Sequence, residues 1–189
     1  MRVIAGEYKG NKIKSVPNQL TRPTGDKIKE SLFQMIGPFF NGGSCLDLFA
    51  GSGALAIEAI SRGMETAILV DIQPKAISII YQNVNHLHIE EKVEVYRNDA
   101  FKALKAIKKR GIQFDVIFLD PPYHKISYNE LLVSIISMNI VRDHGMIVCE
   151  HDPNTLLVNE FEDFIILKYE EYNNTTAITI YQKEVKSNG

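Results

Sequence analysis

The sequence contains only two cysteines, and it lacks any apolar run long enough to form a signal peptide or a membrane-spanning helix. Residues 1–10 instead alternate charged and small side chains, so we expect a cytoplasmic protein with no membrane partner. Cys45 and Cys149 each lie inside an apolar run of strand-like composition, where a reducing compartment keeps buried thiols unpaired. We therefore expect neither a disulfide nor a cysteine-ligated metal.

Internal repeats, low-complexity tracts and linkers rich in Gly, Ser or Pro are also absent. The 189 residues, of which 45% are apolar and 23% charged, have the composition of one globular domain with a sizeable core. We expect residues 1–40 to form a small N-terminal appendage, residues 41–183 the main domain, and residues 184–189 a frayed tail.

Metal-ligand spacing is missing as well. The five histidines do not pair with cysteines or acids at such spacings, so we predict no metal site and expect most of them on the surface: His86, His88, His124, His144 and His151. Only His124 is a candidate for substrate contact, because it adjoins a motif described below.

A strong excess of one charge is absent overall, since the net charge is −2, but the charge is unevenly distributed. Residues 1–40 hold seven Lys or Arg against three acids, which gives +4 there and leaves −6 for the remainder. A second basic run lies in the expected helix 100–110, at Lys102, Lys105, Lys108, Lys109 and Arg110. Both regions could contact nucleic-acid phosphates, or they could be solvated surface and a solubilising tail.

From residue 44 the chain alternates short β-branched runs with segments of helical periodicity, which is typical of a parallel sheet covered by helices. We predict strands at 44–49, 66–71, 92–97, 114–119, 145–150, 163–169 and 175–182, and helices at 26–36, 53–62, 74–86, 100–110 and 127–138. The turn-like Asn173-Asn174 predicts that the last two strands form an antiparallel hairpin. The expected fold class is α/β, a doubly wound, mostly parallel, seven-stranded Rossmann-like sheet.

The first motif that carries chemistry is residues 45–55, CLDLFAGSGAL, an apolar strand that runs into a tight glycine turn and opens a helix. Glycines there allow positive φ and let a ligand lie against bare backbone at a helix N-terminus. Asp71 ends the next strand, eighteen residues beyond Gly53, where a carboxylate can accept hydrogen bonds from ribose hydroxyls. These features predict an adenosine-type cofactor.

An NAD-binding fold shares these features, so the choice of cofactor rests on Asp47, which lies within the strand two residues before the loop. A carboxylate there could meet the cationic amino-acid end of S-adenosylmethionine, whereas it would repel the pyrophosphate of a dinucleotide. Ala56 stands at the third glycine position of G-x-G-x-x-G, but alanine also occurs there in dinucleotide folds. Alternatively, Asp47 caps the turn by accepting loop N–H groups.

The deciding motif is Asp120-Pro121-Pro122-Tyr123, which follows an apolar strand at the edge where open α/β sheets bind ligands. The amine of an aromatic base is a poor nucleophile because its lone pair is delocalised. If the Asp120 carboxylate and the Pro121 carbonyl each accept one N–H, that lone pair is directed at the sulfonium methyl. Tandem prolines orient the carbonyl, and Tyr123 offers a face for stacking a base that has left its helix. The alternative is a simple turn.

Asp99 follows the third predicted strand and precedes a predicted helix. It is placed to accept a hydrogen bond from the adenine amino group of a cofactor, although a plain helix N-cap explains it equally well.

At these residues the chain resembles the class I S-adenosylmethionine-dependent methyltransferases. More closely, it resembles the bacterial family that methylates guanine N2 in small-subunit ribosomal RNA, ribosomal small-subunit methyltransferase D. The closer similarity spans residues 1 to about 183 and rests on the opening RVIAG at 2–6, TRPT at 21–24 with Lys29-Glu30 and Phe33, and DLFAGSGAL at 47–55 with Glu58-Ala59 and Ser61-Arg62-Gly63. Asp-Pro-Pro-Tyr itself also occurs in enzymes acting on adenine N6, cytosine N4 and glutamine side chains.

The resemblance implies transfer of a methyl group from S-adenosyl-L-methionine, leaving S-adenosyl-L-homocysteine (SAH), to guanine N2 in small-subunit ribosomal RNA or an assembling small subunit. It implies catalytic roles for Asp120, Pro121, Pro122 and Tyr123. The implied cofactor contacts are Asp47, Phe49, Ala50, Gly51, Gly53, Asp71, Ile72, Asp99 and Ala100. The implied RNA contacts are Arg2, Arg22, Thr24, Lys27, His124 and Lys125.

Three other functions are weighed against this one. An adenine-N6 methyltransferase acting on DNA or RNA is the alternative within the same class, because the motif does not specify which base carries the amine. An NAD-dependent oxidoreductase shares the fold but not the Asp-Pro-Pro-Tyr motif. A catalytically silent RNA-binding module would be expected to lose the glycine loop or Asp120, and the sequence retains both.

Overall fold

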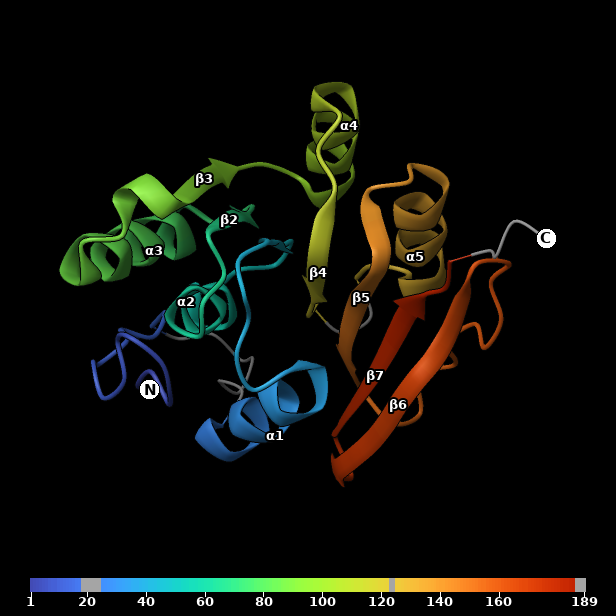
Figure 1. Ribbon diagram of the computed structural model, residues 1–189, viewed down its shortest axis with the longest axis horizontal. Helices are drawn as coiled ribbons and strands as arrows, with labels where there is room; N and C mark the ends of the chain where they lie inside the picture. The colour runs from blue at the N-terminus through green and yellow to red at the C-terminus, as the bar shows by residue number, and fades with distance from the viewer. Residues whose placement is uncertain (18–24, 123–124, 186–189) are drawn as a thin grey trace. The chain divides into compact units, whose positions relative to one another are not determined.

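The computed structural model describes residues 1–17, 25–122 and 125–185 (Figure 1). The chain divides into two compact units, Met1–Ala100 and Phe101–Gly189. Seven strands follow the order β3-β2-β1-β4-β5-β7-β6. This order, with helices between the successive parallel strands, confirms the predicted α/β class and the doubly wound, mostly parallel sheet.

In the first unit three strands pair in parallel, with β2 in the middle: β1 (Ser44–Asp47), β2 (Thr66–Asp71) and β3 (Val93–Arg97). The register joins Cys45 to Ala67 and Ile68 to Glu94. Continuous burial along β1 and β2 explains why both are near-continuous apolar runs rather than alternating ones. The helical elements of this unit are α1 (Asp26–Ile36), α2 (Ala54–Ser61), α3 (Pro74–Leu87) and the short 3₁₀ helix η1 (Glu90–Lys92).

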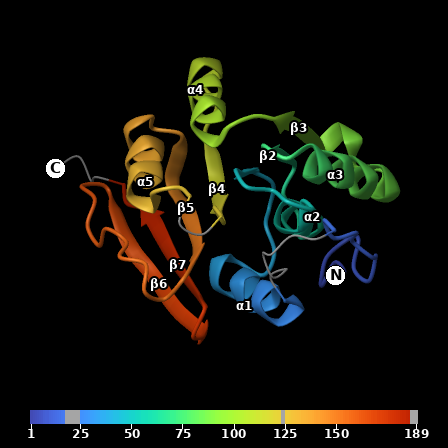
Figure 2. The same ribbon diagram turned by 180° about the vertical axis from the view of Figure 1, so that it is seen from behind.

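The second unit contains helices α4 (Ala100–Arg110), whose first residue still belongs to the first unit, and α5 (Tyr128–Ser137). Its strands are β4 (Phe114–Leu119), β5 (Val141–His151), β6 (Phe164–Asn173) and β7 (Thr176–Lys183). β4 and β5 are parallel, whereas β7 pairs antiparallel with both β5 and β6. The long β6–β7 hairpin is visible in both views and confirms the antiparallel ending (Figures 1 and 2).

The predicted strand that starts at residue 145 begins earlier, at Val141. The intervening Arg142-Asp143-His144 is exposed, and His144 has a φ of 61°. The β4–β5 register is irregular at the same level, between Phe114 and Val116. A charged, locally irregular segment of this kind has the composition of a turn, so periodicity alone does not assign it to a strand.

The start of the chain packs onto the first unit, with residues 4–8 hydrogen-bonded to α2 (Figure 2). The backbone N–H of Glu7 donates to the Ser61 carbonyl at 2.8 Å. Gly6, with a φ of 86°, approaches so closely that a Cβ there would lie 1.8 Å from the Ser61 carbonyl oxygen. This segment is therefore built onto the helix that follows the glycine loop. The predicted domain boundary at residue 40 stays a prediction.

Several smaller expectations concern burial. Cys45 and Cys149 are buried free thiols, as predicted. His86, His88 and His144 are exposed, but His151 is 2% exposed and lies within hydrogen-bond distance of the Thr179 hydroxyl. Among the described histidines the prediction of mostly surface positions is therefore confirmed, and His151, at the end of β5, is the exception. Across residues 1–17, 25–122 and 125–185, no helix has the length and apolar character needed to cross a membrane.

Candidate cofactor and amine sites

The glycine loop of the first unit connects the end of β1 to α2. Gly51 and Gly53 adopt φ values of 56° and 82°, and Gly53 precedes the first residue of α2. The positive φ of Gly53 favours glycine, and a Cβ there would also lie 2.9 Å from the end of the Leu69 side chain, which would have to shift. The loop thus presents bare backbone at a helix N-terminus, as the sequence predicts.

Asp71, at the end of β2, holds this loop in place. One carboxylate oxygen accepts the backbone N–H of Gly51 at 2.9 Å, and the other accepts that of Gln73 at 2.8 Å. A carboxylate oxygen has two lone-pair directions, so both can still accept further hydrogen bonds, such as those from ribose hydroxyls. The neighbouring Ile72 is 62% exposed and provides apolar surface for a ring beside this carboxylate.

Asp47 is the last residue of β1 and is 3% exposed. It accepts backbone hydrogen bonds from Phe49 and Ala56, so its capping role in the loop is confirmed. Burial, and then the charge of Asp71, raise the pKa of Asp47 to about 7. A buried carboxylate whose anion is poorly solvated is strongly stabilised by a cation, so this site fits the sulfonium and ammonium groups of S-adenosylmethionine.

Asp99 lies on the same side of the first unit as Asp71. The backbone N–H of Asn98 donates to the Asp71 carbonyl at 3.1 Å, and Asp99 follows at the position directly before α4. This is the helix N-cap position that the sequence allows. The first unit therefore contains all nine predicted cofactor residues, at or just after the carboxyl ends of three neighbouring parallel strands: Asp47, Phe49, Ala50, Gly51, Gly53, Asp71, Ile72, Asp99 and Ala100.

Asn83 on α3 is a supporting residue that the sequence reasoning missed. It is 1% exposed, and its side-chain amide donates to the carbonyls of Ser52, at 2.9 Å, and Lys14, at 3.0 Å. Its side-chain oxygen accepts the Lys14 N–H at 2.8 Å. Asn83 therefore joins the glycine loop to the N-terminal segment. A polar residue amid the apolar positions of a helix was the only available signal.

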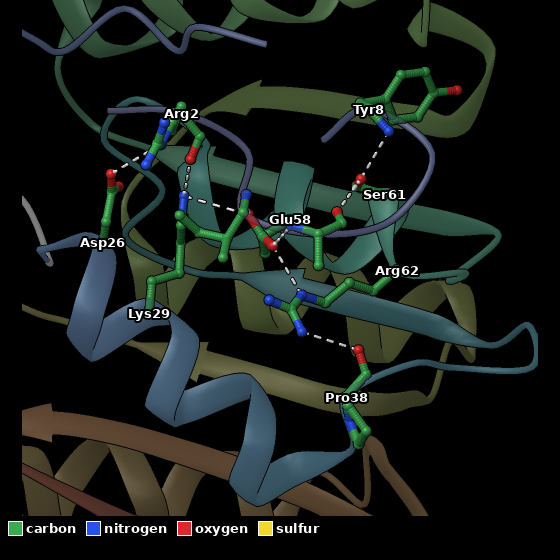
Figure 3. A network of polar contacts seen from close by, with 10 residues as sticks. Arg2, Tyr8, Asp26, Lys29, Pro38, Glu58, Ser61 and Arg62 are labelled. Atoms are coloured by element: carbon green, nitrogen blue, oxygen red, sulfur yellow. Dashed lines mark hydrogen bonds and ion pairs between the residues drawn. The ribbon is translucent and has the colours of Figure 1, made fainter. Parts of the chain in front are cut away.

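A buried ion cluster joins α2 to α1 and to the N-terminal segment (Figure 3). Glu58 is 0% exposed and lies 3.3 Å from Lys29 Nζ and 2.8 Å from Arg62 Nε. It also accepts the backbone N–H groups of Ile4, at 2.9 Å, and Ala5, at 3.0 Å. One carboxylate thus anchors the N-terminal segment, α1 and α2 together.

The two cations of this cluster have further contacts. Lys29 Nζ donates to the Arg2 carbonyl at 2.7 Å, and Arg62 donates to the Pro38 carbonyl at 3.0 Å (Figure 3). The Arg62 guanidinium also lies 4.8 Å from the centroid of the Phe33 ring. Burial lowers the pKa of Lys29, although Glu58 opposes this effect. The sequence signal was Glu58 and Arg62 four residues apart on an otherwise apolar helix.

The amine site predicted from Asp-Pro-Pro-Tyr belongs to the second unit. Asp120 directly follows the buried strand β4, Pro121 is buried, and Asp120 and Pro122 are partly exposed. Nearby, the Tyr128 hydroxyl lies within hydrogen-bond distance of the carbonyl oxygens of Leu119 and Glu150, so its one hydrogen links the ends of β4 and β5. Tyr123 lies outside the described residues.

Among the predicted RNA contacts, Arg2, Lys27 and Lys125 are exposed. Arg2 lies 3.7 Å from the Asp26 carboxylate in a solvent-exposed pair. Arg22, Thr24 and His124 lie outside the described residues. In the second unit all five basic residues of α4 are exposed, along one helix: Lys102, Lys105, Lys108, Lys109 and Arg110.

Known proteins resemble this chain over nearly its whole length. A family model described as "Conserved hypothetical protein 95" matches residues 1–182. "Putative rRNA methyltransferase YlbH" of Bacillus subtilis is 47% identical over 183 residues, 97% of this chain and 99% of that protein. "Ribosomal RNA small subunit methyltransferase D" of Haemophilus influenzae is 31% identical over 183 residues, 96% of this chain and 92% of that protein.

Solved structures of other proteins also resemble this chain. "Putative methyltransferase yhhF" from Escherichia coli has a TM-score of 0.84 and 25% identity, covering 97% of this chain and 98% of that one. A more distant methyltransferase structure, complexed with SAH, has a TM-score of 0.67 and 14% identity over 82% of this chain and 49% of that one, and shows the fold alone. The fold is that of S-adenosylmethionine-dependent methyltransferases.

Proposed function

The chain belongs to the family described as Conserved hypothetical protein 95, and on that premise we propose that it methylates the exocyclic N2 amine of a guanine in small-subunit ribosomal RNA. Its relatives in Bacillus subtilis and Haemophilus influenzae are named as ribosomal RNA methyltransferases, which supports the coarser assignment. The names of these relatives do not state which atom is methylated, so the assignment to guanine N2 is part of our proposal.

Asp120 is the observation that carries the proposal. Asp120 and two consecutive prolines directly follow a buried strand, an arrangement that would set an acceptor beside a carbonyl of restricted orientation. Together they would accept both N–H groups of a base amine and direct the nitrogen lone pair out of the ring plane. The proton leaves the methylated nitrogen late, to Asp120 or to water, so no histidine base is required.

The residues of the first unit hold the cofactor in this proposal. S-adenosylmethionine supplies an electrophilic methyl group when it is bound. Asp47 would compensate the charge of its amino-acid end, and Asp71 would accept from the ribose hydroxyls. Asp99 would accept from the adenine amino group, beside the exposed side chain of Ile72.

Exposed cations would hold the RNA backbone. Arg2, Lys27 and Lys125 keep the contact role predicted for them, and we add the five basic residues of α4, because their shared exposure suits a phosphate surface. The roles of Arg22, Thr24 and His124 remain predictions. The substrate is small-subunit RNA, alone or in an assembling subunit, which places the reaction in the cytoplasm.

The direct test is incubation of the full chain with tritiated-methyl S-adenosylmethionine and small ribosomal subunits lacking their base methylations, followed by nucleoside analysis. We expect label in N2-methylguanosine. Label in N6-methyladenosine would replace guanine by the adenine alternative, which the shared Asp-Pro-Pro motif leaves open. No label in any nucleoside, with cofactor binding intact, would overturn the RNA assignment.

A further inference from the structure

A small pocket lies in the second unit directly beside the Asp-Pro-Pro motif. It has a volume of about 230 Å³ and opens between the start of α5 and the segment after β5. Pockets for drug-sized ligands are larger, about 300–1,000 Å³, so this one suits a single planar ring system. Its lining combines the apolar Pro121, Pro122 and Leu156 with the polar Ser127, Asp152 and Thr155.

Hydrogen bonds to two following residues, Asn154 and Thr155, fix the position of Asp152 in this pocket. Its side-chain oxygen accepts the N–H groups of the Asn154 backbone, at 2.8 Å, and side chain, at 2.9 Å, while its carbonyl accepts the Thr155 N–H at 2.8 Å. Asn129 on α5 bonds the same segment, donating to the Leu156 carbonyl at 3.2 Å and accepting the Val158 N–H at 3.0 Å. The wall that carries Asp152 is therefore held against the helix that forms the opposite wall.

We propose that this pocket receives the target base and that Asp152 selects guanine over adenine by accepting the N1–H of the guanine ring. The proposal rests on the proposed function, because Asp120 and the Pro121 carbonyl are taken to hold the reacting amine. In guanine the N2 amine and the N1–H are adjacent donors on the Watson–Crick edge, the edge on which flipped bases are read. Pro121 lines the pocket together with Asp152, so one base can meet both.

Adenine does not fit this arrangement. Its amine is adjacent to an unprotonated N1, which is an acceptor and would face the Asp152 carboxylate with no hydrogen between them. With adenine bound, N1 and the partly buried Asp152 carboxylate would be two acceptors facing each other, and the hydrogen bond that guanine makes would be lost. A site that hydrogen-bonds its substrate rejects an analogue that lacks the matching donor. The prolines pack on either base equally, so discrimination falls to the polar edge. Asp152 is thus a specificity-determining residue for the reaction.

The test uses 2-aminopurine, which keeps the 2-amino group of guanine but has an unprotonated N1. RNA oligonucleotides carrying either guanosine or 2-aminopurine at the methylated position are compared as substrates for the wild type and for Asp152→Asn. The wild type should prefer guanosine by at least about tenfold. The side-chain amide introduced by D152N can donate to an unprotonated N1, so this variant should narrow the preference by about tenfold or more.

Glu160→Gln is the matched control, because it removes the same charge from the same segment at an exposed position outside the pocket lining. It should retain the wild-type preference. Cofactor affinity and thermal unfolding are measured for both variants, and 2-aminopurine fluorescence reports base binding where turnover is slow. D152N should bind 2-aminopurine RNA more tightly than the wild type does.

The outcomes separate the two proposals. If the wild type forms N2-methylguanosine but D152N keeps the wild-type preference, or loses both substrates equally, the role of Asp152 is wrong and the proposed function stands. If the wild type labels adenine N6 instead, the guanine assignment falls, and the selection by Asp152 falls with it.

Discussion

The glycine loop of the first unit and the Asp-Pro-Pro motif of the second are built in opposite ways. Two side chains distant in sequence hold the loop, since Asp71 accepts the Gly51 N–H and Asn83 donates to the Ser52 carbonyl, and the buried carboxylate Asp47 supports it as well. The motif derives its rigidity from two consecutive proline rings, with the Tyr128 hydroxyl tying the strand ends beside it. A cofactor site assembled from many contacts should lose function gradually, whereas an amine site that depends on one carboxylate should lose it abruptly.

The largest expected effect therefore falls on the second unit. Asp120→Ala should reduce methylation by at least about 10³-fold, because it removes an acceptor aimed at the reacting amine. Cofactor affinity, measured by calorimetry, should change by less than about tenfold. Asp115→Ala, on the strand β4 that leads to Asp120, is the control and should remain active. Full activity of D120A would contradict the role assigned to Asp120.

In the first unit the largest expected effect is on stability. Glu58→Gln leaves Lys29 and Arg62 buried without their counter-charge, which should lower the free energy of unfolding by about 3–5 kcal/mol. Urea unfolding at several pH values measures this. The deficit should shrink as pH rises, since Lys29 can then lose its proton in the folded state while the unfolded chain keeps it. Glu65→Gln, at an exposed position, is the control and should unfold like the wild type. If E58Q were as stable as the wild type, the buried ion cluster would not stabilise the fold.

A smaller, pH-dependent effect should appear at Asp47. Its pKa of about 7 means that the folded protein binds a proton between pH 4 and 7 that the unfolded chain lacks, so stability should fall as pH rises through this range. The cationic cofactor requires the ionised form, so its affinity should increase by up to about tenfold per pH unit below pH 7 and then level off. Asp47→Asn should abolish this dependence in calorimetric titrations. If the cofactor affinity of D47N still changed with pH in the same way, a group other than Asp47 would be responsible.

The smallest effect is expected on α4. The double substitution of Lys105 and Lys108 by alanine should weaken RNA binding a few-fold and reduce the slope of log affinity against log salt by about one to two. Lys75→Ala, an exposed lysine on α3, serves as the control. An unchanged salt slope in the double variant would remove α4 from the RNA surface.

The sequence predicted the fold well because the buried parallel strands are continuous apolar runs and each α-helix from α2 onward follows a strand. The glycine loop, Asp71 and Asp120 were also predictable, since their chemistry depends on local motifs at strand ends. Asn83 and Lys29 were not, because their partners lie far along the chain and no periodicity reports a pairing across 69 or 29 residues. The pocket beside Asp152 likewise depends on a helix and a segment that only tertiary packing brings together.

Asn83 also has an evolutionary consequence. Both of its amide hydrogens and its oxygen are engaged, toward Ser52 and toward both backbone polar groups of Lys14. Aspartate would offer no donor to the two carbonyls, and glutamine would reach one carbon too far. Because its partners are backbone atoms, these hydrogen bonds do not depend on which side chains stand at positions 14 and 52, whereas they do depend on the amide at position 83. The segments that it joins can therefore diverge in sequence, provided that this one amide is inherited unchanged.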